Sequence, residues 1–292
     1  MSMMARRQSP AELMWVRRIG WGGGDTEHWH LRSPSRELCL WLAPQTMRGV
    51  CAEGQLMLLE LDLQKGPHAV SHPVIIAGIE DKALVERHFT WLPAGREYIL
   101  RDIRGMLGHL PDPALRQFYH MVLADDGIMA PLFKARASHR HHHDHVGGLL
   151  EHSHEVATTA ATLCLQHKVG PLSTCVAFVG GLLHDIGKIH LYYNAEDGEG
   201  ICGQHESYNF LVLARQMEAL RMAAPRLFEA LSSCLSIKIG GRVDAYLPAS
   251  MVRMCDRLSV EVSNWQRAFA DAPAYYWYAK SPGDAQLYKR LG

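Results

Sequence analysis

The pattern of hydrophobic and polar positions divides the chain into a β-rich part and a helical part. Between residues 11 and 80, short apolar runs alternate with clusters of glycine, proline and polar residues, which predicts strands joined by turns. The predicted strands are residues 13–20, 28–32, 37–42, 55–63 and 74–78, with a short helix at 44–53. This order favours a small barrel or half-barrel. It is compatible with an OB-type barrel, a common platform for single-stranded nucleic acid.

From about residue 81 the apolar residues recur at spacings of three and four, which predicts helices. The predicted helices are residues 82–89, 97–110, 113–123, 148–168, 171–190, 204–222, 225–233 and 249–270. We therefore expect a mainly α protein with a small β-rich domain at residues 1–90 and a helical domain at 91–270. An aromatic tail at 271–292 is expected to pack on the body.

Composition narrows the class of protein. The chain has 292 residues, of which 48% are hydrophobic and 21% charged, which excludes a disordered, collagen-like or coiled-coil protein. The 30 basic residues balance the 30 acidic ones. This balance argues against a protein that binds nucleic acid through bulk charge alone, and it leaves room for a local basic patch.

The cysteines and the apolar runs bear on the compartment. The seven cysteines are scattered and form no CxxC pair, so we expect no disulfide framework and a reducing cytoplasm. The first ten residues lack the apolar core of a signal peptide, and no uninterrupted apolar run has the length of a membrane span. We expect a cytoplasmic protein without a membrane partner; the sequence is compatible with a homo-oligomer.

Histidine is the anomaly of the composition. Of the 18 histidines, eleven lie between residues 139 and 205 and seven between 139 and 154. Imidazole is the commonest metal ligand in proteins, so this density suggests metal chemistry. A purification tag or a solvated polar loop is the alternative. A tag would lie at a terminus, whereas this cluster is central and embedded in a patterned sequence.

Two motifs place histidine and aspartate in apolar surroundings. Gly147 and Gly148 can form a tight turn into a helix in which His152 shares an apolar stripe with Val156. Further on, His184-Asp185 is embedded in an apolar predicted helix. Because a buried imidazole or carboxylate needs a partner, we expect Asp185 to bind a cation or an ion-pair partner. Side by side, His184 and Asp185 can both ligate one divalent metal.

Three further residues complete the pattern. Lys188 lies about one turn after the His-Asp pair and could neutralise a phosphate oxygen. His205 follows a polar loop, and Asp256 interrupts the apolar face of a late helix. Taken alone, each residue is compatible with a satisfied core histidine or a surface charge. The order of one histidine, a His-Asp pair and a late aspartate on successive helices favours one metal site.

This order resembles that of the HD-domain superfamily, which consists of metal-dependent phosphohydrolases with an all-helical fold. The runs HHDHVGGLLEHSHEV and GGLLHDIGKI are similar to two narrower groups. These are the 3′→5′ exoribonucleases of the YhaM type, in which an OB-fold precedes the HD domain, and the TraI_2-type HD domains associated with MobH relaxases. The resemblance covers roughly residues 95–262.

The resemblance implies roles for individual residues. The implied metal ligands are His152, His184, Asp185, Asp256 and, at the place of the family's Gly-His motif, His205. They would hold one or two divalent ions of manganese, iron, magnesium, nickel or zinc. Lys188 matches the lysine of the HDxGK pattern and would contact the scissile phosphate. His142 and His143 match the paired histidines of the family and would bind the substrate phosphate or protonate the leaving oxygen.

One departure concerns a second metal ion. The families carry a His-His pair before the last aspartate, whereas this chain has Ser236-Ile237-Lys238-Ile239-Gly240-Gly241 there. Three interpretations stay open. The site holds a single ion, or His142, His143 or His205 replaces the pair, or the site has lost activity.

Three functions follow. The first is a metal-dependent phosphodiesterase or nuclease acting on single-stranded nucleic acid, with Asp185 helping to orient the attacking water. Lys188, Arg136 and Arg140 would neutralise charge on the phosphate, and the N-terminal tryptophans could stack bases. The second is a nucleotidase or cyclic-nucleotide phosphodiesterase. The third is a DNA-processing or accessory protein of a mobile element with a degenerate site.

Overall fold

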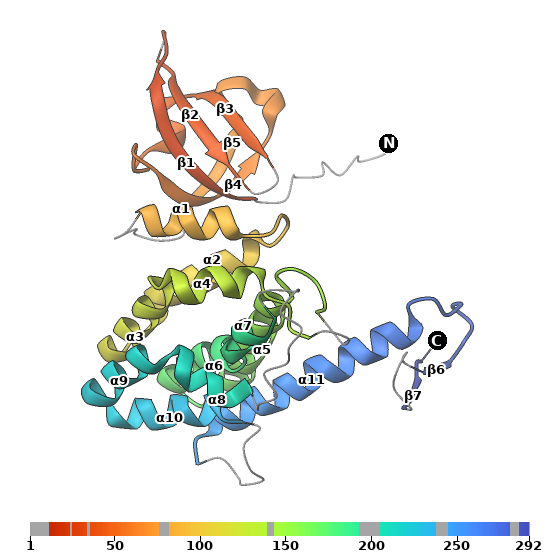
Figure 1. Cartoon of the computed structure of the whole chain (residues 1–292). Helices are drawn as coiled ribbons and strands as arrows, with labels where there is room; N and C mark the ends of the chain where they lie inside the picture. Colours follow the sequence, from red (N-terminus) through yellow and green to blue (C-terminus); the bar gives the residue numbers. More distant parts are fainter. Residues whose placement is uncertain are drawn as a thin grey trace. The chain divides into compact units, whose positions relative to one another are not determined.

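The computed structural model describes residues 12–23, 25–33, 36–75, 82–138, 143–192, 205–237, 245–280 and 286–291. The chain forms two compact units, Met1–His109 and Leu110–Gly292. Strands β1 to β5 and helices α1 and α2 belong to the first unit, and the remaining helices and a short hairpin belong to the second (Figure 1). The expected class, a helical protein with a small N-terminal β region, is confirmed.

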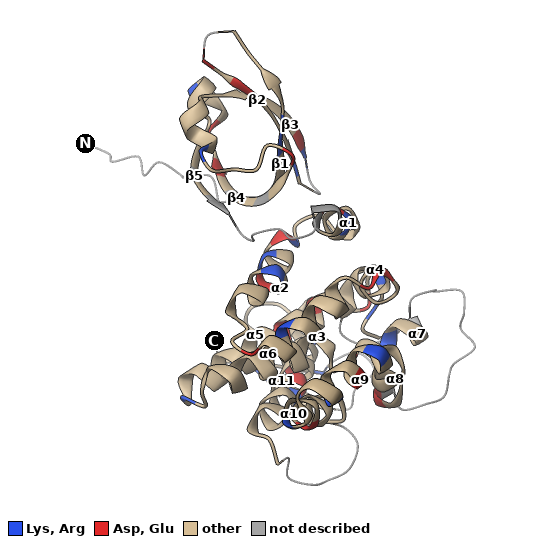
Figure 2. Ribbon diagram, turned by 90° about the vertical axis from the view of Figure 1, so that its left-hand side faces the viewer, with Lys and Arg blue, Asp and Glu red and all other residues tan. Residues whose placement is uncertain are grey.

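The first unit is built on one antiparallel sheet. Its strands are β1 (Glu12–Trp21), β2 (Glu27–Arg32), β3 (Glu37–Leu42), β4 (Gln55–Leu61) and β5 (Val70–Ile75). They pair in the order β3-β2-β1-β4-β5. Alternate residues of β2, such as Trp29 and Leu31, are buried, because successive side chains of a strand point to opposite faces. The sheet curls around this core, as Figure 2 shows from the side.

The connections of the sheet differ in detail from the prediction. The expected helix at 44–53 is only a short 3-10 turn, η1 (Pro44–Met47), and a second 3-10 segment, η2 (Leu63–His68), precedes β5. Two helices follow the sheet, α1 (Lys82–Trp91) and α2 (Glu97–His109), and both group with it. The division after His109 thus comes later than the change from strands to helices, near which the sequence analysis placed the domain boundary.

The second unit is helical. Its elements are α3 (Pro113–Leu123), α4 (Asp126–Lys134), α5 (Gly148–Gln166), α6 (Pro171–Leu183), η3 (Ile186–Lys188), α7 (Ile189–Tyr192), α8 (His205–Val212), α9 (Ala214–Ala223), α10 (Pro225–Leu235) and α11 (Leu247–Phe269). Local signals set several starts. The side chain of Asp112 accepts hydrogen bonds from the amides of Ala114 and Leu115 and so caps α3. Gly147, at φ 82°, allows the tight turn into α5.

Two glycines let the central helices approach closely. A Cβ on Gly181 of α6 would lie 2.7 Å from the Cα of Ala157 on α5, and one on Gly180 would lie 2.5 Å from the Cβ of Cys234 on α10. Neither distance leaves room for a larger residue. Helix α11 packs against both α5 and α6. These three helices form the centre of the second unit (Figure 1).

The segment Pro171–Leu191 is long and apolar enough, by composition, to cross a membrane. However, 83% of its most apolar window is buried inside the unit, as in the core helix of a soluble protein. The cysteines among the described residues are free thiols, which agrees with the expectation of no disulfide framework.

The C-terminal tail forms a hairpin. Strands β6 (Tyr278–Lys280) and β7 (Leu287–Lys289) pair antiparallel, and Tyr288 packs with Ala268 and Phe269 at the end of α11. The Trp265 indole donates a hydrogen bond of 3.1 Å to the Lys289 carbonyl. The hairpin is therefore attached to the last turns of α11.

We expect Gly181→Ala to destabilise the second unit, because the new methyl group would have to displace the backbone of α5. Overpacking of this kind costs about 1–3 kcal/mol. Urea unfolding measures the change in the free energy of unfolding.

Gly105→Ala on α2 is the matched control. A Cβ there meets no atom within 4 Å, so the change should stabilise the helix by about 0.5–1 kcal/mol. A Gly181→Ala protein as stable as the wild type would contradict the close contact between α5 and α6.

Candidate metal centre

Four buried side chains from three helical segments converge in the second unit. His152 comes from α5, His184 and Asp185 follow the end of α6, and Asp256 comes from α11. One potential ligand atom from each lies within 4.8 Å of all the others. His152 and His184 are fully buried, and Asp185 and Asp256 are 1% and 7% exposed. All four are among the metal ligands that the sequence predicts.

His184 and Asp185 are adjacent in the chain, and both side chains can face the site because helix α6 ends just before them. Helix α6 ends at Leu183, His184 is its C-cap, and Asp185 has left helical geometry with φ −113° and ψ 13°. The apolar pattern predicts an unbroken helix over 171–190, and this detail is wrong. Adjacent side chains on a regular helix point about 100° apart. The break lets both side chains face one point.

Asn209 of α8 stabilises this break, and the sequence analysis missed it. Its side-chain oxygen accepts the Gly187 amide at 2.7 Å, and its amide nitrogen donates to the carbonyls of His184 and Leu235. Asn209 is fully buried. It thus replaces backbone hydrogen bonds that the interrupted helix loses. An amide side chain within an apolar helical segment was the available signal.

A backbone carbonyl fixes the tautomer of His184. The Nδ1 atom lies 2.7 Å from the Gly181 carbonyl oxygen. A carbonyl only accepts, so Nδ1 carries the proton and donates. The Nε2 atom faces the two carboxylates, 3.4 Å from Asp185 Oδ2 and 3.4 Å from Asp256 Oδ1. His184 is therefore oriented to ligate a metal through Nε2.

A hydroxyl and a carboxylate orient His152 in the same way. Its Nδ1 lies 3.2 Å from Ser259 Oγ, which in turn lies 2.9 Å from Glu155 Oε2. Hydrogen bonds from His143 and Ser259 lower the pKa of Glu155, so its carboxylate is ionised and accepts the Ser259 proton. The Ser259 oxygen then accepts from Nδ1 of His152. The Nε2 atom faces Asp256 Oδ1 at 3.2 Å and Asp185 Oδ2 at 3.4 Å.

Lys188 adds a positive charge at the edge of the cluster. Its Nζ lies 2.6 Å from Asp185 Oδ2, and the residue is 9% exposed. The 3-10 turn η3, which follows directly on Asp185, brings the lysine back over the aspartate. The ammonium group is thus fixed beside the candidate ligands, and its contact with a substrate phosphate stays a prediction.

The two buried carboxylates control the charge of the histidine between them. Burial disfavours the imidazolium, but Asp185 and Asp256 outweigh it and raise the pKa of His184 to about 9. Burial also acts against ionisation of Asp256. Hydrogen bonds from His152 and His184 outweigh this and hold its pKa well below the usual range. Without a metal, a proton on His184 therefore balances part of the negative charge.

This set of donors fits a divalent metal ion. Two imidazole nitrogens and two carboxylate oxygens suit manganese, iron, nickel or zinc better than calcium, which prefers oxygen ligands throughout. Both imidazoles hold their second nitrogen in a hydrogen bond, as metal-binding histidines usually do. A metal would replace the proton on His184.

The other predicted site residues have different surroundings. His143 Nε2 lies 3.5 Å from Glu155 Oε2, on the side of His152 that bears Nδ1 rather than the ligand nitrogen. Arg136, more than one third exposed, pairs with Asp144 at 2.8 Å. Their roles toward substrate stay predictions.

Three predicted site residues, and the segment where the families carry a His-His pair, lie wholly or partly outside the described residues. Arg140 and His142 lie there, and so does the side chain of His205, the first residue of α8. The same holds for residues 238–244, which include most of the segment that lacks the His-His pair.

Comparison with known families agrees with this geometry. Residues 149–244 match the model of the HD domain, which supports membership of the HD superfamily. The match includes His152, His184 and Asp185, whereas Asp256 lies beyond its end and joins the site through the fold. No curated protein and no solved structure gives a significant match to the chain. An HD domain with such a cluster indicates a metal-dependent hydrolase that binds divalent metals.

Metal binding should release a proton at neutral pH, because the pKa of His184 lies near 9 before the metal enters. The affinity should rise up to about tenfold per pH unit and level off above pH 9. Calorimetric titration with Mn²⁺ at pH 7, in buffers of different ionisation enthalpy, counts the protons released, and about one per ion is expected. A count near zero would contradict the raised pKa.

The same shift makes the metal-free fold depend on pH. A raised histidine pKa stabilises the folded state fully below the unfolded value of 6.5, and this contribution disappears as the pH rises toward 9.

Ser259→Ala should weaken metal binding about 10- to 100-fold without removing a ligand, because Nδ1 of His152 loses its acceptor. Ser259→Thr keeps the hydroxyl and should restore most of the affinity. Metal content by mass spectrometry and the absorption spectrum of the Co²⁺ protein report the change. An alanine variant with wild-type affinity and spectrum would show that the Ser259–Glu155 pair does not orient His152.

Proposed function

We propose that this protein is a metal-dependent phosphodiesterase that cleaves single-stranded nucleic acid. The observation that carries the proposal is the buried cluster of His152, His184, Asp185 and Asp256 with Lys188 beside it. The HD-domain match implies the coarser class, a metal-dependent phosphohydrolase. The choice of nucleic acid as the substrate rests on the first unit.

Each residue of the cluster would have its own role in phosphodiester hydrolysis. A bound divalent metal supplies a water of lowered pKa and polarises a phosphoryl oxygen. His152 and His184 hold their ligand nitrogens in one direction through fixed tautomers. Lys188 stabilises the negative charge that develops on the phosphate. The carboxylate of Asp185 lies within reach of the same region, where it can orient the attacking water and accept its proton.

The first unit offers aromatic surface for stacking. Of its tryptophans on β1 to β3, Trp15 and Trp29 are buried, whereas Trp21 and Trp41 are 68% and 48% exposed. The His28 ring stacks on Trp41 at 4.2 Å, and the Arg18 guanidinium lies 4.3 Å from the Trp21 ring. Exposed rings beside cationic groups are the usual means of binding single strands without sequence preference.

The strand pairing supports an OB-like interpretation of this unit. Strands β1, β2 and β3 form a meander, and β4 pairs back onto β1 and continues to β5. An OB-type barrel joins its strands in this order and binds its ligand over strands 2 and 3. His28 and Trp41 face each other across β2 and β3. We therefore propose that the first unit binds the single-stranded nucleic acid that the metal centre cleaves. We propose the cytoplasm as the place of this reaction.

A cleavage assay tests the proposal. With Mn²⁺, the wild-type protein should shorten end-labelled single-stranded RNA or DNA, and it should act far less on mononucleotides and cyclic nucleotides. Asp185→Ala should abolish cleavage. Lys188→Ala should lower it about 100- to 1000-fold, the usual effect of removing one group that stabilises the transition state.

Lys65→Ala is the control, because Lys65 is an exposed lysine paired with Asp62 in the first unit. If the wild-type protein cleaves no single strand with any divalent metal that is tested, the proposal is overturned. A preference for mononucleotides or cyclic nucleotides would support small-nucleotide hydrolysis, the competing hypothesis from the sequence.

A further inference from the structure

The C-terminal hairpin exposes four consecutive aromatic residues. Tyr275, Tyr276, Trp277 and Tyr278 are 80%, 45%, 56% and 47% exposed. The inner face of the hairpin, with Tyr288, already covers the end of α11. The aromatic residues therefore do not serve to attach the hairpin. Exposed apolar patches of this kind usually mark an interaction site.

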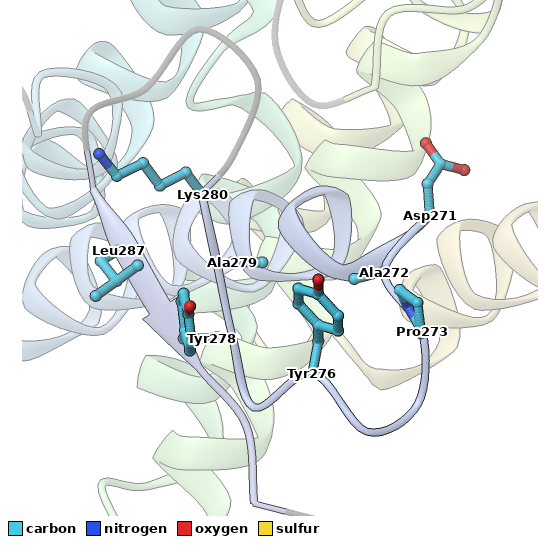
Figure 3. A pocket seen from close by; sticks show the side chains of 8 residues that line it. All are labelled: Asp271, Ala272, Pro273, Tyr276, Tyr278, Ala279, Lys280 and Leu287. Atoms are coloured by element: carbon cyan, nitrogen blue, oxygen red, sulfur yellow. The ribbon is translucent and has the colours of Figure 1, made fainter.

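The exposed rings are arranged in contact with one another. Ring centroids are 5.2 Å apart for Tyr275 and Tyr276, 6.4 Å for Tyr276 and Tyr278, and 5.2 Å for Trp277 and Tyr278. Tyr276 and Tyr278 stand side by side along a pocket of about 550 Å³, with Lys280 beyond them (Figure 3). Asp271 and Leu287 also line this pocket.

The same surface is positively charged, although the whole chain has no net charge. Over residues 265–292 the sequence has four basic residues, Arg267, Lys280, Lys289 and Arg290, against two acidic ones, Asp271 and Asp284. Lys289 Nζ lies 5.2 Å from the centre of the Trp277 ring. Aromatic and cationic groups are thus in direct contact.

The strand register puts these groups on one face. Tyr278 pairs with Lys289 and Lys280 with Leu287, and all four side chains are exposed. The pair between them, Ala279 and Tyr288, points toward α11. A ring and two cations on one short face match the two needs of single-stranded nucleic acid, stacking for bases and charge for phosphates. An apolar protein segment would need the rings but not the cations.

We propose that this hairpin is a second binding surface for single-stranded nucleic acid, in addition to the first unit. The proposal rests on the proposed function, since it concerns the same substrate. Helix α11 connects the surface to the metal centre. It carries Asp256 and ends at Phe269, about 20 Å further along the helix axis at 1.5 Å per residue. Figure 1 shows the hairpin at this end of α11.

A hydrogen bond from Trp265 to Lys289 and a cation–π contact between Arg290 and Phe269 hold the hairpin on this helix. The Arg290 Nε donates at 2.8 Å to the Tyr276 carbonyl, and its guanidinium lies 4.6 Å from the centre of the Phe269 ring. A strand of several nucleotides bound at the rings is thereby held at a set distance from the metal ligands.

Binding to metal-free protein tests the surface apart from cleavage. We would measure the fluorescence anisotropy of labelled oligo-dT and oligo-U with the full chain in EDTA. The double variant Tyr276→Leu/Tyr278→Leu keeps apolar volume but removes stacking, and it should weaken binding at least about tenfold. Lys280→Gln/Lys289→Gln should weaken binding and lower the magnitude of the slope of log affinity against log salt by about 1.4, since each lysine that contacts a phosphate of a single strand contributes about 0.7.

Two matched controls separate these effects from general changes of the surface. Tyr98→Leu removes a tyrosine of similar exposure, 44%, on α2, and Arg226→Gln removes an exposed cation at the start of α10. Both should bind within twofold of the wild type. Hydrolysis of bis(p-nitrophenyl) phosphate with Mn²⁺ should be unchanged in the hairpin variants, because they leave the metal ligands intact. Unaltered melting temperatures would show that the variants fold.

The possible results separate the two proposals. Hairpin variants that bind like the wild type overturn the hairpin surface, and the proposed function survives if the strand is still cleaved. Binding that depends on the hairpin, without cleavage under any metal, supports the surface and overturns the function. A wild-type protein that binds no single strand overturns the hairpin surface. So does hairpin-dependent binding to anionic lipid vesicles in place of oligonucleotides, which would assign the surface to membranes.

Discussion

Two carboxylates buried a few ångströms apart impose the main constraint on the second unit. Asp185 and Asp256 can stay ionised in an apolar interior only if positive charge and donors surround them. Lys188 contacts Asp185, and the protonated His184 lies between both carboxylates. Such an arrangement is typical of a cation site. Here the proton on His184 and the ammonium group of Lys188 supply the positive charge that a metal ion would otherwise supply. For stability alone, well-packed apolar residues of similar volume would often serve as well as this buried cluster.

Close helix packing and one helix break make the convergence possible. Gly181 brings α6 against the backbone of α5, so that His152 and His184 meet with ring centroids 5.2 Å apart. The same residue offers its carbonyl to His184. The chain then leaves the helix at Asp185, and Asn209 satisfies the backbone groups that this change exposes. Packing, imidazole orientation and ligand direction therefore depend on the few residues around Gly181.

The sequence was sufficient to select the four side chains that converge, but not to predict the backbone that directs them to one point. His152, His184, Asp185 and Asp256 could be selected because polar residues on apolar faces need partners, and the fold brings all four together. The break after Leu183 was not predicted, since an apolar run through residue 190 has the same periodicity whether the helix continues or ends. Asn209 and Ser259 were missed for a related reason. Their value lies in hydrogen bonds to residues far away in the sequence, which no local pattern records.

The absence of net charge explains why local surfaces matter for substrate binding. A polyanion gains little from a protein whose charges balance, so its affinity must come from places where cations are concentrated and from contacts that do not depend on charge. If the substrate is single-stranded nucleic acid, as proposed, the described residues of the second unit offer two such places: Lys188 beside the candidate metal ligands, and the cations of the hairpin among four exposed rings. Helix α11 joins them, since it contributes Asp256 to one and carries the other at its end. Stacking would then supply much of the affinity, and salt would weaken binding less than in a protein that relies on bulk charge.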